Sequence, residues 1–304
     1  MSRFALITSG GGAKGAFTIG ALTHMASIGI SRFDIISGTS TGSLIAALVA
    51  VGKLDVLRNE YTNVDNDSIL TKQNIVNNLL GNRPFLFDTE PLRDLISKHI
   101  TPDVFNALSS PDATTLCLTA ISLQTGIPTV FSNKVLPVPA SGAYKVQQVR
   151  SRDELVLALL ASSSQAGFLP PVTIGQEQFV DGGNREVIPT HVVVDLAPDE
   201  IFVLSNNPGT LFAAANPYTD VLSTILRAIT IFIQDVREND MKVLQDYCHT
   251  NGKTFHVVEP TSDLDPENPT GLRFNRQAMA GWMTQGQLRA RNILGMVMRG
   301  NRIV

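Results

Sequence analysis

The residues with the clearest chemical potential lie in two glycine-rich turns near the N-terminus. One turn spans Gly10–Gly15 and the other spans Gly38–Gly42. Each follows a short apolar run and precedes a helix-like stretch, so each is expected to connect a strand to a helix. The second turn has the pattern G-x-S-x-G, which is typical of a nucleophile elbow with Ser40 at its tip. The first turn would offer backbone N–H groups to a developing oxyanion, so the pair predicts acyl transfer or hydrolysis.

The elbow pattern gains its value from its context. Roughly one chain of this size in ten would carry an isolated G-x-S-x-G by accident, given ordinary glycine and serine usage. Here Gly38 and Gly42 would let the helix pack closely on the strand, which a tight and strained turn requires. The helix that follows would also place positive potential near Ser40, where an alkoxide and then an oxyanion would form.

A serine nucleophile needs a base, and the sequence favours an aspartate. None of the five histidines lies in a recognisable catalytic context, although His191 remains a weaker candidate. Asp181 follows a short hydrophobic strand and precedes Gly182 and Gly183, which would let its loop approach Ser40 closely. A free aspartate has a pKa of about 3.9 and is a poor base for a hydroxyl. The site is therefore expected to bury Asp181 and raise its pKa.

The first turn also fits another function. Gly10–Gly15 matches G-x-G-x-x-G, the dinucleotide fingerprint, and Asp34 lies about 20 residues further on. In a dinucleotide-binding fold, the acidic residue that contacts the ribose lies at the end of the second strand. Here Asp34 begins its strand, and the nucleophile elbow occupies the end of that strand. A phosphate-binding P-loop is excluded because Ala16 follows Gly15. A dinucleotide-binding oxidoreductase remains the less favoured alternative.

Composition limits the remaining classes. The chain has 304 residues, of which 43% are hydrophobic and 17% charged, enough for one substantial core. The net charge of −3 gives no basic footprint for nucleic acid or anionic lipid. Cys117 and Cys248 are far apart, so neither a disulfide framework nor a zinc site is expected, and Cys117 should be a buried structural thiol. With no signal peptide or membrane span apparent, we expect a cytoplasmic protein; secretion without an N-terminal signal stays open.

Strand-like and helix-like segments alternate along the chain, which predicts βαβ units and a mainly parallel sheet between helix layers. Strands are expected at residues 3–8, 34–37, 115–122, 201–205 and 254–258. Helices are expected at residues 14–29, 41–52, 54–63, 89–99, 152–163, 219–248 and 275–299.

Three further segments are interpreted from their composition and periodicity. Residues 64–88 are irregular, and we expect a packed loop there in preference to a lid. Residues 259–272 are polar with three prolines and are interpreted as a surface excursion. The segment 219–248 carries Ile225 and Phe232 among apolar residues at helical spacing, and mixed charges favour an ordinary core-facing helix over a lipid-surface helix.

Four separated elements resemble the patatin-like phospholipase family. They are Gly10–Gly15, matching its G-G-G-x-[RK]-G oxyanion motif, Gly38–Gly42, matching its elbow, Ala161–Pro171, similar to its A-S-x-A-x-P-x-x-F-P-P stretch, and Asp181–Gly183, matching its D-G-G. Their order and approximate spacing agree over most of the chain. The resemblance implies an α/β/α three-layer sandwich with a mainly parallel central sheet, formed by residues 1–304 as a single domain.

The resemblance also implies roles for individual residues. Ser40 would be the nucleophile and Asp181 the general base of a Ser–Asp dyad that uses no histidine, cofactor or metal. The oxyanion hole is then expected among these residues: Gly10, Gly11, Gly12, Ala13, Lys14, Gly15 and Thr41. Gln165-Ala166 departs from the usual small-Pro pair of the family, which leaves substrate preference open.

The resulting prediction is a lipid acyl hydrolase of the phospholipase A or lysophospholipase type, acting through an acyl-serine. Its partners would be phospholipid, lysophospholipid or another fatty-acyl ester, with transient membrane-surface contact and no nucleic acid. An acyltransferase using the same dyad is an alternative. A binding module on a hydrolase-like scaffold is a further one, against which the intact Ser40 and Asp181 argue.

Overall fold

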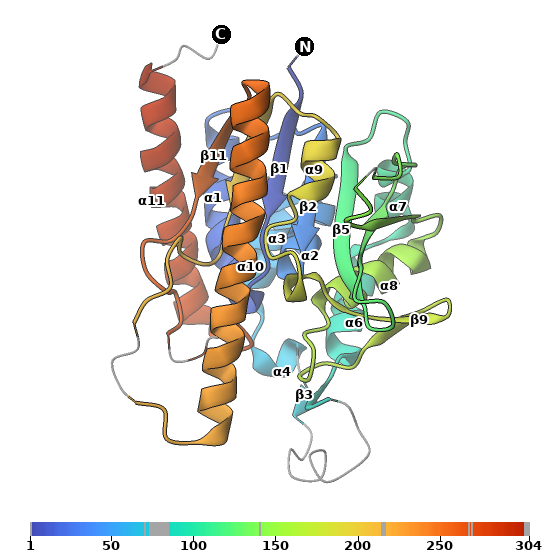
Figure 1. The fold of residues 1–304 in the computed structure, drawn as a ribbon, viewed down its shortest axis with the longest axis vertical. Coiled ribbons are helices and arrows are strands. Elements are labelled where there is room, and N and C mark those ends of the chain that lie inside the picture. Colours follow the sequence, from blue (N-terminus) through green and yellow to red (C-terminus); the bar gives the residue numbers. More distant parts are fainter. Residues whose placement is uncertain are drawn as a thin grey trace.

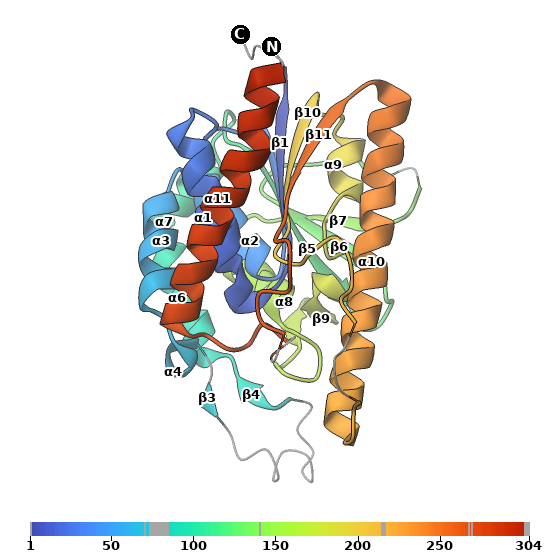
Figure 2. The ribbon, with the colours of Figure 1, turned by 90° about the vertical axis from the view of Figure 1, so that its left-hand side faces the viewer.

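The chain forms three layers, with a mixed β-sheet between two layers of helices (Figure 1). The computed structural model describes residues 2–69, 71–72, 85–139, 141–213, 217–266, 268 and 270–300. Figure 2 shows the sheet nearly edge-on, with α1, α3 and α11 on one side and α9 and α10 on the other. The expected α/β/α sandwich is therefore confirmed.

The strands are β1 (Phe4–Thr8), β2 (Ile35–Thr39), β3 (Thr71–Lys72), β4 (Phe87–Asp88), β5 (Thr115–Ser122), β6 (Pro128–Ser132), β7 (Lys145–Gln148), β8 (Val172–Ile174), β9 (Glu177–Asp181), β10 (Glu200–Leu204) and β11 (Thr254–Val258). The helices are η1 (Gly12–Lys14), α1 (Gly15–Ser27), α2 (Thr41–Val49), α3 (Leu54–Asn63), α4 (Asn66–Ile69), α6 (Glu90–His99), α7 (Pro102–Leu108), α8 (Arg152–Ser163), η2 (Gly182–Asn184), α9 (His191–Asp195), α10 (Val221–Asn251) and α11 (Arg276–Gly300).

The central sheet has the order β11-β10-β1-β2-β5-β6-β7. The strands from β11 to β5 pair in parallel, and β6 runs antiparallel to β5. Strand β9 also pairs antiparallel with β5 and carries β8 on its other side. Because the β1, β2 and β5 strands are parallel, the turns that follow β1 and β2 emerge at the same edge of the sheet.

Alternating side chains of the strands build a core on each face of the sheet. Leu6 and Ile36 face the core shared with α1, α2, α8 and α11. Their neighbours Ile7 and Ile35 face the core shared with α9 and α10. Strands buried on both faces read as continuous apolar runs, which is why β1 and β2 were predictable from sequence.

The sequence-based boundaries agree with the structure for the long helices and the parallel strands. The segments β6, β7, β8 and α7 were not expected, and the irregular stretch 64–88 contributes α4, β3 and β4. Residues 70 and 73–84 of that stretch lie outside the described part of the chain. Among the described residues, none of the helices combines the length and apolar character that a bilayer span requires.

One expectation was wrong for the first half of α10. We expected its apolar residues to face the core, but Ile225 is 50% exposed and Phe232 is 67% exposed. The second half of the helix does pack on the sheet, through Met241 and Leu244. The helical period identifies which residues share a face, and it cannot tell whether another element covers that face. The amino-terminal half of α10 projects past the carboxyl ends of the strands (Figures 1 and 2).

Helices α1 and α11 pack unusually closely through glycine. A Cβ atom added at Gly20 would lie 1.9 Å from the carbonyl oxygen of Met283. One added at Gly286 would lie 2.0 Å from the carbonyl oxygen of Phe17. Real Cβ atoms cannot approach backbone oxygens that closely, so any side chain at either position must push the helices apart.

This contact predicts opposite effects for two glycine substitutions. Gly20→Ala should lower the free energy of unfolding by about 1–3 kcal/mol, because the added methyl group overpacks a helix interface. Gly281→Ala on α11 should raise it by up to about 1 kcal/mol, because the space around Gly281 is open and alanine is the better helix former. Urea unfolding of the two variants and the parent measures both values. Equal stability of Gly20→Ala and the parent would contradict the close α1–α11 contact.

Candidate active site

Strand β5 brings the elbow serine and the predicted base together. On one edge of β5, β2 ends with Thr39 opposite Thr119, and β9 ends with Asp181 opposite the next residue, Ala120. Because β6 occupies the other edge of β5, β2 and β9 meet end to end along a single edge. Ser40 directly follows Thr39, so the two chain segments deliver Ser40 and Asp181 to the same point.

The backbone at Ser40 has the strained conformation expected of a nucleophile elbow. Its φ of 57° and ψ of −131° lie in a region that non-glycine residues rarely occupy. Helix α2 begins at the next residue, Thr41, so the amino end of the helix lies beside the serine. A Cβ at Gly42 would lie 2.2 Å from the carbonyl oxygen of Thr8, which explains why only glycine fits there.

Two further serines hold the elbow, and the sequence analysis assigned no role to either. The Ser162 hydroxyl accepts a hydrogen bond from the Ser40 amide at 3.1 Å and donates to the Thr119 carbonyl at 2.7 Å. The Ser43 hydroxyl donates to the Ser40 carbonyl at 2.6 Å. Ser162 lies within the motif at 161–171, which was the available signal. Its hydroxyl connects the end of α8 to both the elbow and β5.

The carboxyl group of Asp181 is buried beside Ser40. The residue is 7% exposed, and its carboxyl group interacts with the Ser40 side chain. Its Oδ1 also accepts a hydrogen bond from the Gly183 amide at 2.7 Å. Burial raises the pKa of Asp181 to about 6, because the loss of solvation outweighs the interactions with the Ser40 side chain and the Gly183 amide, which lower it. A carboxyl group with this pKa is a far stronger base than a free aspartate at neutral pH.

The first glycine turn lies against the elbow. A Cβ at Gly10 would be 3.1 Å from the Cβ of Ser40, which shows how closely the two turns approach. Four amides of the predicted oxyanion set have carbonyl acceptors: those of Gly10 (Val187, 3.4 Å), Ala13 (Gly271, 2.8 Å), Lys14 (Gly11, 3.1 Å) and Gly15 (Gly12). In the described part of the chain, the amides of Gly11, Gly12 and Thr41 are the members of the predicted set without a carbonyl acceptor. Thr41 is the first residue of α2, where an amide lacks an intrahelical acceptor.

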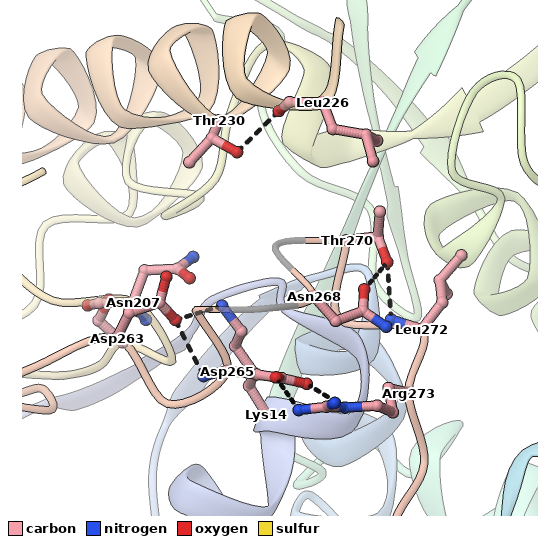
Figure 3. Close-up of polar contacts among 11 residues, drawn as sticks. Lys14, Asn207, Leu226, Thr230, Asp263, Asp265, Asn268, Thr270, Leu272 and Arg273 are labelled. Atoms are coloured by element: carbon pink, nitrogen blue, oxygen red, sulfur yellow. Dashed lines mark hydrogen bonds and ion pairs between the residues drawn. The ribbon is translucent and has the colours of Figure 1, made fainter. Parts of the chain in front are cut away.

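The segment 259–272 is part of the site, whereas the sequence analysis interpreted it as a surface excursion. Its Gly271 carbonyl accepts the Ala13 amide, and its Asp263 forms an ion pair with the buried Lys14, with Nζ–Oδ1 at 2.8 Å. Asp265 pairs with Arg273, the residue that directly follows this segment (Figure 3). The sequence suggested that the polar side chains of this segment face solvent. In the structure they fix the segment against the first glycine turn.

Ser40 and Asp181 line a cavity of about 930 Å³ with largely apolar walls. One wall comes from α2, α6 and the segments after α8 and before α11, and includes Leu44, Leu92, Leu95, Phe168, Leu169 and Leu272. The opposite wall comes from α10, through Leu226, Ile229 and Ile233. Figure 3 shows Leu226 and Thr230 of α10 across from Thr270 and Leu272. The volume and lining suit a ligand with a long apolar part.

Other candidate residues lie elsewhere. Asp34 precedes β2 and its carboxylate accepts the Phe4 amide at 2.8 Å, at the opposite end of the sheet from the glycine turns. It cannot meet a ribose bound at those turns, which removes support from the dinucleotide alternative. His191 contacts Glu186 at 2.9 Å and does not line the cavity. Cys117 is buried, and burial raises the pKa of its thiol to about 12.

In the part of the chain that the structure describes, no three His, Cys, Asp or Glu side chains gather as a metal site would require.

Comparison with known proteins places the chain beside lipid hydrolases. The family model described as patatin-like phospholipase matches residues 6–194. A cUMP-AMP-activated phospholipase of Escherichia coli is 47% identical over 62 residues, which are 19% of this chain and 19% of the relative. A cGAMP-activated phospholipase of E. coli strain TW11681 is 28% identical over 194 residues, covering 59% of this chain and 51% of the relative. The chain thus spans about half or less of these relatives.

Solved structures with a similar course of the chain share little sequence with it. VipD from Legionella pneumophila is 12% identical with a TM-score of 0.45, covering 97% of this chain and 67% of VipD. ExoU from Pseudomonas aeruginosa, in its complex with SpcU, is 17% identical with a TM-score of 0.41, covering 97% of this chain and 52% of the matched chain. These likenesses concern the arrangement of the elements alone.

The raised pKa of Asp181 predicts how the reactivity of Ser40 depends on pH. A base works only when deprotonated, so reactivity should fall about tenfold per pH unit below about pH 6 and level off above it. The rate at which a fluorophosphonate labels Ser40 between about pH 4.5 and pH 8, followed by mass spectrometry, measures this dependence. Asp181→Asn should label slowly at every pH. A parent rate that stays constant down to about pH 4.5 would contradict the predicted base.

Proposed function

Because this chain belongs to the patatin-like phospholipase family, we propose that it is a lipid acyl hydrolase cleaving carboxylic esters of phospholipids or lysophospholipids. The observation that supports this most directly is the position of Ser40 beside the buried carboxyl group of Asp181, whose pKa is raised, in the wall of an apolar cavity. A hydroxyl next to a base of raised pKa is suited to attack a carbonyl carbon. The apolar walls are suited to hold the fatty-acyl chain beside it.

In the proposed reaction, Ser40 Oγ bonds to the ester carbonyl carbon while its proton passes to Asp181. The carbon–oxygen bond to the alcohol then breaks, and Asp181 returns the proton to the departing oxygen. An acyl-serine remains. Water next gives a proton to Asp181 and attacks the acyl carbon, and Ser40 leaves with that proton as the fatty acid is released.

The oxyanion would be held by main-chain donors. We assign this role to the amides of Gly11, Gly12 and Thr41, because the other amides of the predicted set already have carbonyl acceptors. Gly11 and Gly12 belong to the turn that packs on the elbow, and Thr41 adds the positive end of α2. Removing a single oxyanion donor typically costs about 10²–10³ in rate, so this hole would supply a large share of the catalysis.

The dyad predicts a clear result with natural lipids. Incubation with a mixed phospholipid extract should release free fatty acids and lysolipids, measured by mass spectrometry. Ser40→Ala and Asp181→Asn should each lower the rate at least about 10³-fold, because each removes a group that makes or accepts a bond in the transition state. Ser110→Ala and Asp112→Asn make the same chemical changes at exposed positions after α7 and should leave the rate unchanged.

Hydrolysis that survives in Ser40→Ala would exclude the proposed nucleophile. The same assay separates hydrolysis from acyl transfer: when alcohols or lysolipids are added as acceptors, a transferase would form new esters in place of free fatty acid.

We also propose that a cyclic dinucleotide raises the activity of this chain. The proposal is supported by its two E. coli relatives, one named as cUMP-AMP-activated and the other as cGAMP-activated. An activator that binds the active conformation better shifts the population towards it, typically by a factor of about 5–150. Fatty-acid release with and without cUMP-AMP or cGAMP tests this, with AMP as a control ligand. Equal rates under all conditions would exclude this regulation by either nucleotide.

A further inference from the structure

The amino-terminal half of α10 is apolar on two sides. One side lines the cavity through Leu226, Ile229 and Ile233. The other side points to solvent, where Val221 is 76% exposed and Phe232 is 67% exposed. Large apolar side chains on a helix are normally buried, and among the described residues no element covers the outer side of this half.

The exposed apolar surface continues onto the segment before α10. Leu211, Phe212 and Tyr218 are between 37% and 45% exposed and also line the cavity. We call the following six residues the mouth surface: Leu211, Phe212, Tyr218, Val221, Ile225 and Phe232. Three of its members are both outer surface and cavity wall, so the surface runs directly into the opening of the cavity.

The mouth surface carries little charge. Asp220 and Arg227 are the charged residues between positions 211 and 233 in the sequence. The Asp220 carboxylate accepts the Ser223 amide at 2.8 Å, and the Arg227 guanidinium donates to the Phe212 carbonyl at 3.0 Å. Charged residues become frequent only beyond Gln234, in the half of α10 that packs on the sheet. Contiguous apolar surface of this kind marks an interaction site, and its low charge argues against an electrostatic partner.

We propose that the mouth surface docks on a lipid bilayer and delivers acyl chains directly from the bilayer into the cavity. The inference rests on the proposed lipid hydrolase function. An acyl chain that left a membrane through water would expose its apolar area, at about 0.8 kcal/mol per CH₂. If the mouth surface places the cavity opening at the boundary between the lipid headgroups and the acyl chains, the acyl chain enters the cavity without contacting water. Tyr218 fits this boundary because its ring is apolar and its hydroxyl is polar.

The contact is therefore apolar, and the occupant is a bilayer without a requirement for anionic lipid. Its affinity should change little with ionic strength, unlike that of a polybasic membrane-binding segment. A second copy of this chain is the competing occupant and is separated by the experiment below.

The test replaces three mouth residues that do not line the cavity, Val221→Ser, Ile225→Ser and Phe232→Ser together. Flotation with phosphatidylcholine vesicles, in a Ser40→Ala background that preserves the lipid, should show at least about tenfold weaker partitioning. The parent should bind equally at low and high salt. A matched control changes Val135, Val138 and Leu288 to serine, which are 80%, 86% and 53% exposed and lie outside the cavity lining. It should bind like the parent.

Unchanged flotation of the mouth variant would overturn the proposal. So would a dimer, seen by light scattering, that the mouth variant disrupts while vesicle binding persists, because the surface would then join two copies. If the triple variant melts at a lower temperature than the parent, Phe232→Ser alone takes its place. That variant should show reduced partitioning with the parent's melting temperature, and unchanged partitioning would again overturn the docking site.

An activity comparison separates this proposal from the hydrolase function on which it rests. With Ser40 intact, the mouth variant should cleave a soluble short-chain ester at the parent's rate and vesicle lipid at least about tenfold more slowly. Equal loss on both substrates would contradict docking. If the parent cleaves neither substrate, the hydrolase function fails, and the flotation result still decides whether the mouth surface binds a bilayer.

Discussion

The register of two strands on one edge of β5 is the constraint on which the site depends. Thr119 and Ala120 are consecutive, and they fix the ends of β2 and β9 respectively. A slip of β9 by two residues would keep its side chains on the same faces but move Asp181 by about 7 Å. Ser40 and Asp181 would then no longer lie side by side. The strained backbone at Ser40 and the buried carboxyl group of Asp181 can act on the same substrate only in this register.

The energetic cost of the site is concentrated in two residues. Ser40 has a backbone conformation that costs of order 1–3 kcal/mol, and burial disfavours the ionised form of Asp181. Both costs persist because the surroundings hold the conformation: Ser162 and Ser43 fix the backbone of Ser40, and Gly183 donates to the Asp181 carboxyl group. The burial that makes the folded state less favourable also makes Asp181 basic enough to accept a proton near neutral pH.

Sequence reasoning predicted the parts of the molecule that rest on local patterns. Strands β1 and β2, the long helices and both glycine turns follow from apolar runs, periodicity and turn chemistry. The pairing of β9 with β5 joins residues far apart in the chain, and short strands such as β6 carry no distinctive pattern. Ser162 and Asp263 are ordinary polar residues whose roles arise only from their neighbours in space. A free aspartate is a poor base, and this predicted that Asp181 would be buried with a raised pKa. The residues that bury it could not be predicted from the sequence.

Helix α10 connects the opening of the cavity to the chain segment that follows Asp181, through its buried second half. There Asp240 accepts the Ile188 amide at 2.9 Å, and its carbonyl accepts the Thr190 hydroxyl at 3.2 Å. Burial, with a further contribution from Glu186, raises the pKa of Asp240 to about 9, so the group stays neutral at physiological pH. Ile188 and Thr190 lie on the chain segment that follows Asp181. The amino-terminal half of α10 therefore lines the mouth of the cavity, while its second half holds the segment that carries Asp181. The opening is thus positioned relative to the reacting atoms by the same hydrogen bonds that anchor the helix.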